Sequence, residues 1–198
     1  MSCSGERAWR PAGRRAEESL LGIAFNETRL KGAFVVEPER FNDERGFFAR
    51  SFCQREFDEH GLESRLVQCN VSQNVLQGTV RGMHMQRPPH GEVKLVRCTR
   101  GSLYDVIIDF REDSPTYLEH VGVELTAQNY RMLYIPLGFA HGFMTLEDDT
   151  EIFYQMSEFY APGHAAGYRW NDPVFRIKWP SKVRVISQRD RDYPDFAR

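Results

Sequence analysis

The sequence predicts an all-β protein, and three observations support that fold class. From about residue 21 onward, Val, Ile, Phe, Tyr and Thr gather in runs of about five to eight residues that Gly, Pro, Asn and Asp interrupt. Apolar and polar side chains alternate within the clearest of these runs. Helical periodicity is weak except near residues 54–60, where Gly61 ends a short helix. Many short strands at this spacing predict a sandwich or barrel of the jelly-roll type with a few short helices.

Two strands show the clearest alternation, and turn signals separate them from their neighbours. Residues 103–110 form the first, and one of its faces carries Tyr104, Val106, Ile108 and Phe110 while aspartates lie on the other. Residues 151–156 form the second, with Ile152, Tyr154 and Met156 on one face. The turn signals are a hairpin at 99–102, a loop at 111–115 and a sharp corner at 135–138.

The two ends of the chain differ from the middle. Residues 1–20 hold Gly, Pro, Ser and four Arg with little apolar pattern, which predicts a flexible leader. The arginines would also suit a mitochondrial presequence, but three glutamates in the same stretch argue against it. We therefore expect one jelly-roll domain over residues 21–185, followed by a C-terminal tail at 186–198.

Composition and charge narrow the function classes. The 26 Lys and Arg residues against 28 Asp and Glu leave no basic excess for binding nucleic acid. No run of about 18 apolar residues exists, and the first residues lack an apolar signal-peptide core, which disfavours membrane insertion and secretion. The four cysteines show no C-x-x-C spacing, so we expect reduced thiols in the cytoplasm.

Several familiar catalytic motifs are missing from the sequence. It contains neither the G-x-x-x-x-G-K-[ST] loop nor the G-x-G-x-x-G loop that cradle phosphates, and no strand–helix alternation that would carry them. A G-x-S-x-G nucleophile elbow is missing as well. These observations disfavour an ATPase, a dinucleotide-dependent oxidoreductase and the most recognisable class of hydrolase.

Polar side chains gather on segments that otherwise resemble buried strands, within residues 68–94 and 134–160. They are Gln68, Asn70, Arg81, His84, Gln86, His90, Lys94, His141, Tyr154 and Tyr160. Any one of them could be a satisfied core group or a surface residue. A buried polar group without a partner costs about 1–3 kcal/mol. Because this many polar groups lie on neighbouring strands, the pattern favours a binding site in the mouth of the barrel.

A series of segments also matches a known family in order and in spacing. They are residues 41–48, 68–72, 80–86, 94–96, 109–111, 114–116 and 135–143, Tyr154, Tyr160, and residues 170–173 and 179–180. These segments, which cover roughly residues 30–180, resemble the dTDP-4-dehydrorhamnose 3,5-epimerase family of deoxysugar biosynthesis, a family of cupin-type jelly rolls. The resemblance implies a cofactor-free epimerase that inverts C3 and C5 of a nucleotide-linked 4-keto-6-deoxyhexose through an enolate. The expected conversion is dTDP-4-dehydro-6-deoxy-D-glucose to dTDP-4-dehydro-L-rhamnose.

The resemblance implies four catalytic residues. His84 would be the base, with Asp172 orienting its imidazole and stabilising the imidazolium. Lys94 would stabilise the charge that develops on O4 of the sugar. Tyr154 would return a proton on the opposite face, since a phenol with an ordinary pKa of about 10 can protonate an enolate carbon.

The resemblance also implies the substrate contacts. Arg45 and Arg81 would clamp the pyrophosphate, because guanidinium groups form bidentate hydrogen bonds with phosphate oxygens. Tyr160 would present an aromatic face to the nucleobase. The sugar would be contacted by Gln68, Asn70 and His141. Simpler interpretations remain open. Arg45 could do no more than pair with Asp43, Tyr160 could cap the core, and Asn70 could fix a turn.

Some positions depart from the pattern of the family, and other hypotheses stay open. Met85 stands where an aromatic residue is common, Arg50 where many members carry Glu, and residues 163–167 lack an acidic residue near the nucleotide end. The choice of nucleotide is therefore open, as is epimerisation at C3 alone or C5 alone. A non-catalytic cupin that binds a sugar nucleotide is a further alternative. By resemblance, the assembly would be a homodimer built by exchanged strands.

A metal-dependent cupin oxygenase is the hypothesis from another enzyme class. Residues 136–141 keep the P-x-G-x-x-H motif of metal cupins, but His84-Met85-Gln86 stands where the H-x-H pair belongs. Only His84, His141 and Glu92 are then available as ligands, fewer strong donors than zinc or iron sites generally use. We therefore expect no bound metal.

Overall fold

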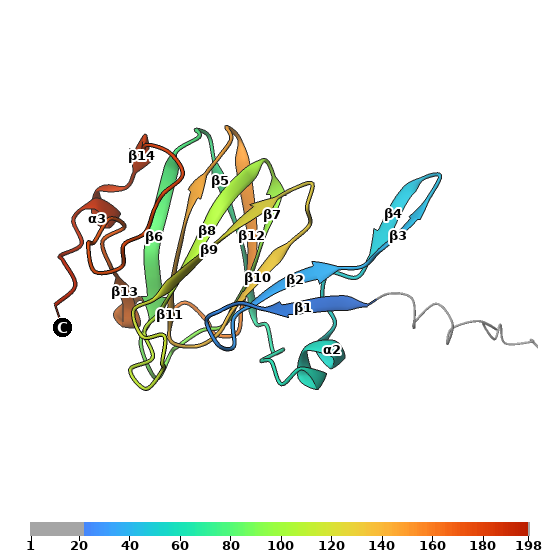
Figure 1. The fold of residues 1–198 in the computed structure, drawn as a ribbon, viewed down its shortest axis with the longest axis horizontal. Helices are drawn as coiled ribbons and strands as arrows, with labels where there is room; N and C mark the ends of the chain where they lie inside the picture. The colour runs from blue at the N-terminus through green and yellow to red at the C-terminus, as the bar shows by residue number, and fades with distance from the viewer. Residues whose placement is uncertain (1–21, 198) are drawn as a thin grey trace, which may run out of the picture.

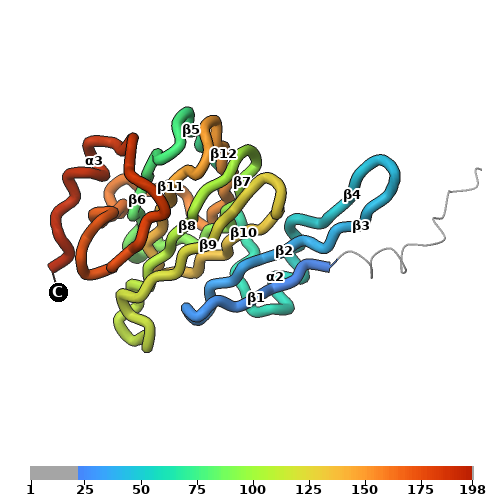
Figure 2. The backbone as a smooth tube through the Cα atoms, turned by 45° about the horizontal axis from the view of Figure 1, so that its top comes forward, coloured from blue at the N-terminus to red at the C-terminus, as the bar shows by residue number. Residues whose placement is uncertain are grey.

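The protein folds into two antiparallel sheets that face each other, seen from two directions in Figures 1 and 2. The computed structural model describes residues 22–197, so the predicted leader at 1–20 lies outside the described residues. In spatial order, the first sheet contains β1 (Ile23–Glu27), β2 (Phe34–Pro38), β10 (Met132–Ile135), β7 (Lys94–Arg100), β12 (Thr150–Met156) and β5 (Gln68–Asn74). The second contains β13 (Ala165–Gly167), β6 (Thr79–Gln86), β11 (Phe139–Thr145), β8 (Ser102–Asp109) and β9 (His120–Thr126), and β14 (Val185–Ile186) pairs with β6. The predicted all-β fold class is confirmed.

The elements outside the two sheets are short. A hairpin of β3 (Arg40–Asp43) and β4 (Gly46–Ala49) projects away from the sheets, at the end of the molecule opposite the C-terminal segment (Figures 1 and 2). Helix α2 (Gln54–Glu59) lies where the sequence predicts a helix, and its Phe57 is buried. The others are the 3-10 turn η1 (Pro162–His164) and helix α3 (Gln188–Arg191). No helix within residues 22–197 has the length and apolar character needed to cross a membrane.

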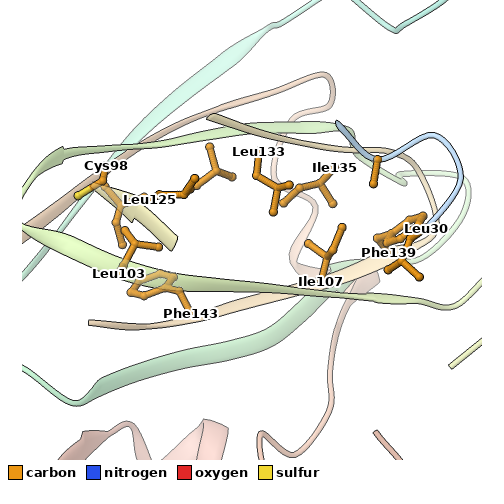
Figure 3. Packing of buried hydrophobic residues seen from close by; sticks show 12 residues of the cluster. Leu30, Cys98, Leu103, Ile107, Leu125, Leu133, Ile135, Phe139 and Phe143 are labelled. Carbon is orange, nitrogen blue, oxygen red and sulfur yellow. The ribbon is translucent and has the colours of Figure 1, made fainter. Parts of the chain in front are cut away.

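The main core lies between the two sheets. Figure 3 shows Leu103 and Ile107 of β8 opposite Leu133 and Ile135 of β10, all of them buried. Each such side chain contributes about 1.5–3 kcal/mol when it is removed from water. The alternation in β8 is as predicted, and both of its faces are buried: Val106 and Ile108 pack on the outer side. The aspartates of this strand therefore point into the protein.

The outer face of the second sheet is covered by the C-terminal part of the chain. Val106 and Ile108 belong to a cluster with Phe175, and Tyr168 and Phe196 pack against it. Phe196 lies within the segment that the sequence predicts to be a tail. Residues 186–197 thus pack on the barrel, because this sheet has apolar residues on both faces and its outer face needs a cover.

Candidate active site

A cavity of about 950 Å³ opens between the two sheets and is closed on one side by the C-terminal segment. Eight of the ten predicted site residues line it: Gln68, Asn70, Arg81, His84, Lys94, His141, Tyr154 and Tyr160. The other two, Arg45 and Asp172, lie elsewhere. The volume falls within the range of about 300–1,000 Å³ that small-molecule sites occupy.

Strand pairing explains how residues far apart in sequence meet in this cavity. Asn70 of β5 is opposite Tyr154 of β12, and Gln68 is opposite Met156. On the second sheet, His84 of β6 is opposite His141 of β11. Because side chains alternate between the faces of a strand, these registers turn both sets toward the cavity. His84 therefore stands on one sheet and Tyr154 on the other.

Close backbone packing fixes the strand that carries His84. Gly82 has a φ of +129°, and a Cβ built on it would lie 2.5 Å from the Cα of Gly142 in the neighbouring strand. Only glycine allows both that conformation and that approach. The backbone two residues before His84 is therefore held against β11.

The imidazole of His84 is held by a buried carboxylate. Its Nε2 lies 2.8 Å from Oδ1 of Asp190, which is 2% exposed. The other oxygen of Asp190 accepts a hydrogen bond from the backbone N–H of Gly82 at 3.2 Å. Burial pushes the pKa of Asp190 up, but the hydrogen bonds and charges of His84, Gly82 and Arg189 outweigh it, and the pKa lies below its ordinary value. Asp190 is therefore ionised at neutral pH, ready to stabilise an imidazolium.

The predicted pairing of His84 with Asp172 is not found. Asp172 is buried, and its two carboxylate oxygens accept the backbone N–H groups of Val174 at 2.8 Å and Phe196 at 2.6 Å. It ties the end of the chain to the turn at 171–174, and this role occupies both oxygens. The partner of His84 is Asp190 instead.

Although the sequence predicts residues 186–198 to be a tail, a local pattern in this segment indicates the short helix that carries Asp190. Ser187 precedes α3, and its Oγ accepts a hydrogen bond from the backbone N–H of Asp190 at 3.1 Å. A Ser followed three residues later by an acidic residue is a helix-start pattern. Together with the pairing of β14 and β6, this turn brings Asp190 to the cavity.

Tyr154 carries a phenol on the opposite sheet. Burial raises the pKa of Tyr154 above its ordinary value, and the nearby charge of Arg81 lowers it by less. The phenol is therefore protonated at neutral pH. Arg81 is itself held, since its Nε donates to Oδ1 of the buried Asn74 at 2.8 Å.

Two further pairs of ionisable side chains contribute Lys94, Glu92 and His141 to the wall of the cavity. Lys94 and Glu92 are both buried, with 2.7 Å between Nζ and Oε1. His141 and Asp105 form a second imidazole–carboxylate pair, with 2.6 Å between Nε2 and Oδ1. Asp105 comes from the aspartate face of β8, which explains why that face is polar although it is buried.

The donors of the metal hypothesis are already engaged. Nε2 of His84 is held by Asp190, Nε2 of His141 by Asp105, and Glu92 pairs with Lys94. Within residues 22–197, no group of three or more His, Cys, Asp or Glu side chains has the arrangement of a metal site.

The mouth of the cavity carries amides and an exposed aromatic ring. Gln68 donates from its Nε2 to Oδ1 of Asn70 at 3.3 Å, and its own Oε1 accepts the backbone N–H of Tyr160 at 3.2 Å. Tyr160 is 55% exposed, so it does not cap the core. A planar, polar ligand could reach this ring from solvent.

Arg45 lies outside the cavity of its own chain. It sits at the tip of the hairpin of β3 and β4, with its side chain 83% exposed and its Nε 3.1 Å from Oδ2 of Asp43. The simpler interpretation of Arg45, a pair with Asp43, thus holds within one chain.

The cavity also contains residues that the sequence did not predict to bind a sugar nucleotide. Arg189 lies with its Nη2 3.3 Å from Nε2 of His84. The ring of Tyr193 lies 6.1 Å from that of His84 and occupies space that a Cβ on Gly167 would fill. Ser72 and Glu92 each place in the cavity wall a buried side-chain oxygen that has no hydrogen-bond partner among the described residues. A bound ligand could use these oxygens.

The arrangement suits proton transfer on a carbon acid. A planar ligand between the sheets would have the imidazole–carboxylate pair of His84 and Asp190 on one side and the protonated phenol of Tyr154 on the other. The buried ammonium group of Lys94 lies in the cavity wall. A proton taken by the first group could be replaced from the second on the opposite face.

Comparisons with known proteins point to one family. A family model described as dTDP-4-dehydrorhamnose 3,5-epimerase matches residues 27–198. A dTDP-4-dehydrorhamnose 3,5-epimerase from Methanothermobacter thermautotrophicus is 44% identical over 173 residues, 85% of this chain and 92% of the relative. A dTDP-4-dehydrorhamnose 3-epimerase from Streptomyces niveus is 36% identical over 82% of this chain and 79% of its own length. The crystal structure of dTDP-4-dehydrorhamnose 3,5-epimerase from Bacillus anthracis, with TDP and PPi bound, is 39% identical, has a TM-score of 0.85, and covers 88% of this chain and 100% of that one.

Proposed function

The chain belongs to the dTDP-4-dehydrorhamnose 3,5-epimerase family, and from that membership we propose that it inverts C3 and C5 of dTDP-4-dehydro-6-deoxy-D-glucose, forming dTDP-4-dehydro-L-rhamnose. The ketone at C4 acidifies the C–H bonds at C3 and C5, so the reaction needs a base, a proton donor on the other face and stabilisation of the enolate. These are the groups that line the cavity.

The observation that carries the proposal is the opposition of the His84–Asp190 pair and Tyr154 across the cavity. His84 removes the proton, and Asp190 stabilises the imidazolium, as in other histidine–carboxylate pairs. Tyr154 returns a proton on the opposite face. General acid–base groups of this kind each contribute about 10²–10⁴-fold. The reaction balances without a redox step, because one C–H bond breaks and one forms at each carbon.

Lys94 stabilises the enolate oxygen in this scheme. Its ammonium group is buried beside Glu92, where water screens it little. The ketone oxygen carries only a partial negative charge, whereas the enolate oxygen carries close to a full one, so this cation stabilises the transition state more than the ground state.

The remaining cavity residues bind the substrate. Arg81 binds the pyrophosphate, and Tyr160 stacks on the nucleobase at the mouth. The sugar is contacted by Gln68, Asn70 and His141. In support, the Bacillus anthracis relative was solved with TDP and PPi bound.

The functional assembly in this proposal is a homodimer in which the hairpin of β3 and β4 crosses to the other subunit. Three observations support it: the hairpin projects from its own barrel, it exposes Phe41 and Phe48 by 53% and 63%, and Arg45 at its tip lies outside its own cavity. Burial of such aromatic rings is a usual driving force for assembly. Arg45 would then join Arg81 at the pyrophosphate of the neighbouring site.

We place the enzyme in the cytoplasm, with a nucleotide sugar and no nucleic acid as its partner. The described cysteines, Cys53, Cys69 and Cys98, are free thiols, which suits a reducing compartment.

Epimerisation at C3 alone is the second candidate. The 3-epimerase from Streptomyces niveus is 36% identical, and residues 163–167 lack the acid that the resemblance predicts near the nucleotide. Incubation with dTDP-4-dehydro-6-deoxy-D-glucose, borohydride reduction and assignment of the ring configuration by NMR coupling constants separate the two. We expect the L-configured sugar; a product inverted only at C3 would establish the second candidate.

A further inference from the structure

A second cavity, of about 700 Å³, lies on the C-terminal side of the molecule and takes no part in the proposed reaction. Its wall carries Arg169, Trp170, Asn171, Lys182, Arg184 and Arg191. Four of these six side chains are cationic. The residues that line this cavity belong to the C-terminal segment, part of which covers the outer face of the second sheet.

The positive charge of this segment is concentrated and weakly compensated. Residues 169–191 contain seven Lys or Arg and two Asp, in a chain whose net charge is −2. Both aspartates are buried, and their oxygens serve other groups: Asp172 holds backbone N–H groups, and Asp190 holds His84. Like charges held close together repel each other, so such a cluster favours a bound anion.

The individual cations are available for binding. Among the described residues, no carboxylate forms an ion pair with Lys182, Arg184 or Arg191. Arg169 pairs with Asp195 through Nη2, but its Nε is buried and has no hydrogen-bond partner in residues 22–197. A buried guanidinium N–H without an acceptor is costly, and a ligand oxygen would satisfy it.

The backbone that carries these cations is fixed. The N–H of Arg184 donates to the carbonyl of Gly78 at 2.8 Å, and β14 pairs with β6 directly afterwards. Gly78 lacks a Cβ, which would lie 2.9 Å from the carbonyl oxygen of Lys182. The chain at 182–186 is thus packed tightly against the barrel, so the backbone that carries these side chains has a fixed position.

We propose that this cavity binds a phosphate-bearing ligand, a nucleoside diphosphate, separately from the substrate in the catalytic cavity. Arginine binds phosphate oxygens in bidentate fashion, and Lys182 adds a point charge. The indole of Trp170 provides an aromatic surface for a base. The volume of the cavity is sufficient for a molecule of this size.

The position of the cavity connects it to the proposed base. Ile186 lines both cavities, so β14 and α3 form a common wall. In α3, Asp190 faces His84 while the next residue, Arg191, lines the basic cavity. A ligand that engages Arg191 therefore restrains the helix that carries Asp190.

Titration calorimetry with ADP tests the site. The Lys182→Gln/Arg184→Gln variant removes two lining cations, and Arg176→Gln/Lys178→Gln is its matched control, with two exposed cations of the same segment outside the cavity. We expect wild type and control to bind ADP alike and the first variant to bind it about a hundredfold more weakly, because two charge-assisted hydrogen bonds are lost. Arg81→Gln should lose only the binding of ADP in the catalytic cavity, where Arg81 contacts the pyrophosphate, and should keep the binding event that Lys182→Gln/Arg184→Gln loses.

Two further probes identify the ligand and its location. Inorganic pyrophosphate should bind more weakly than ADP, and adenosine should not bind; equal binding of pyrophosphate and ADP would overturn the nucleoside part of the proposal. With ADP bound, amide hydrogen exchange should slow at residues 182–191. The proposal is overturned if wild type does not bind ADP, if both double variants lose binding equally, or if the slowed amides lie instead at residues 68–74 of the catalytic cavity.

Discussion

Nε2 of His84 lies 2.8 Å from Oδ1 of Asp190, a residue 106 positions further along the chain. His84 belongs to a central strand of the barrel, whereas Asp190 belongs to a short helix near the C-terminus. The proposed base is therefore completed by the last segment of the chain. The contacts that hold this C-terminal segment against the barrel therefore also hold the imidazole of His84 in position.

Exchange of the two aspartates for asparagine should separate catalysis from stability. Asp190→Asn keeps the shape of the side chain but removes the charge that stabilises the imidazolium, so kcat should fall by about 10²–10⁴-fold. Asp172→Asn should leave the kcat of the folded protein near wild type and lower the thermal midpoint, because its carboxylate caps two backbone N–H groups. Steady-state kinetics and thermal unfolding of both variants check this. A loss of kcat confined to Asp172→Asn would show that Asp172, and not Asp190, supports the imidazole of His84.

Replacement of Tyr154 by phenylalanine should uncouple proton removal from inversion. His84 would still remove a proton and return deuterium to the same face, so solvent exchange would continue while epimerisation falls by about 10²–10³-fold. Because burial raises the pKa of Tyr154 above its ordinary value, the wild-type enzyme should keep its proton donor throughout the neutral and mildly alkaline range. NMR of the substrate in deuterium oxide measures both rates. Equal loss of exchange and inversion would contradict the assignment of Tyr154 as the acid of the second face.

The proposed crossing of the hairpin of β3 and β4 to the other subunit predicts complementation between two variants of low activity. Arg45→Ala and His84→Ala should each have low activity, for different reasons: one removes a phosphate contact and the other the base. In a mixed dimer, one of the two sites would receive both native residues, so an equimolar, co-refolded mixture should regain about a quarter of the wild-type activity. No recovery in a mixture shown by mass spectrometry to contain mixed dimers would contradict the crossing of the hairpin.

Asp109 should make stability depend on acid pH. Burial raises the pKa of this carboxyl, but hydrogen bonds from Arg111, Ser114 and Thr116 lower it to about 2. Because the folded pKa is below the unfolded one, the stabilisation is complete above about pH 4 and is lost as the pH falls to about 2; we expect at most about 2 kcal/mol. Denaturant unfolding of wild type and Asp109→Asn should give a difference in unfolding free energy that shrinks over this interval. A constant difference would show that the ionisation of Asp109 contributes nothing.

A methyl group at Gly82 should destabilise the protein. Alanine there would require a φ of +129° and would place its Cβ 2.5 Å from Gly142, so we expect a loss of about 2–3 kcal/mol in unfolding free energy. Gly163→Ala is the control, since nothing lies within 4 Å of its built Cβ. Chemical denaturation of both variants checks this. Equal stability of the two variants would mean that the strands near His84 can separate at little cost.

The local parts of the fold were predictable from the sequence. Alternation located β8 and β12 to within a residue, and the short helix near 54–60 is present, because periodicity and turn residues act over a few positions. The pairing of β5 with β12, which brings Asn70 opposite Tyr154, connects segments about eighty residues apart and leaves no local trace. The pairing of β5 with β12 could therefore be found only in the structure.

The site was predictable where its residues lie on strands and not where they lie near the chain ends. His84, Lys94 and Tyr154 stand out as polar groups in apolar runs, and all three line the cavity. Asp190 lies in a polar segment that resembles a solvated tail, so its burial depends on how residues 186–197 pack on the second sheet. Arg45 was predicted as a phosphate ligand, but it lies at the exposed tip of the hairpin of β3 and β4, outside the cavity of its own chain.

The most direct test of the proposed reaction is to follow the C3 and C5 protons of dTDP-4-dehydro-6-deoxy-D-glucose by NMR while wild-type enzyme and His84→Ala act on it in deuterium oxide. We predict loss of both signals with wild type and retention of both with His84→Ala. Retention of both signals by folded wild-type protein, or rapid exchange by His84→Ala, would contradict the assignment of this cavity as an epimerase site with His84 as its base.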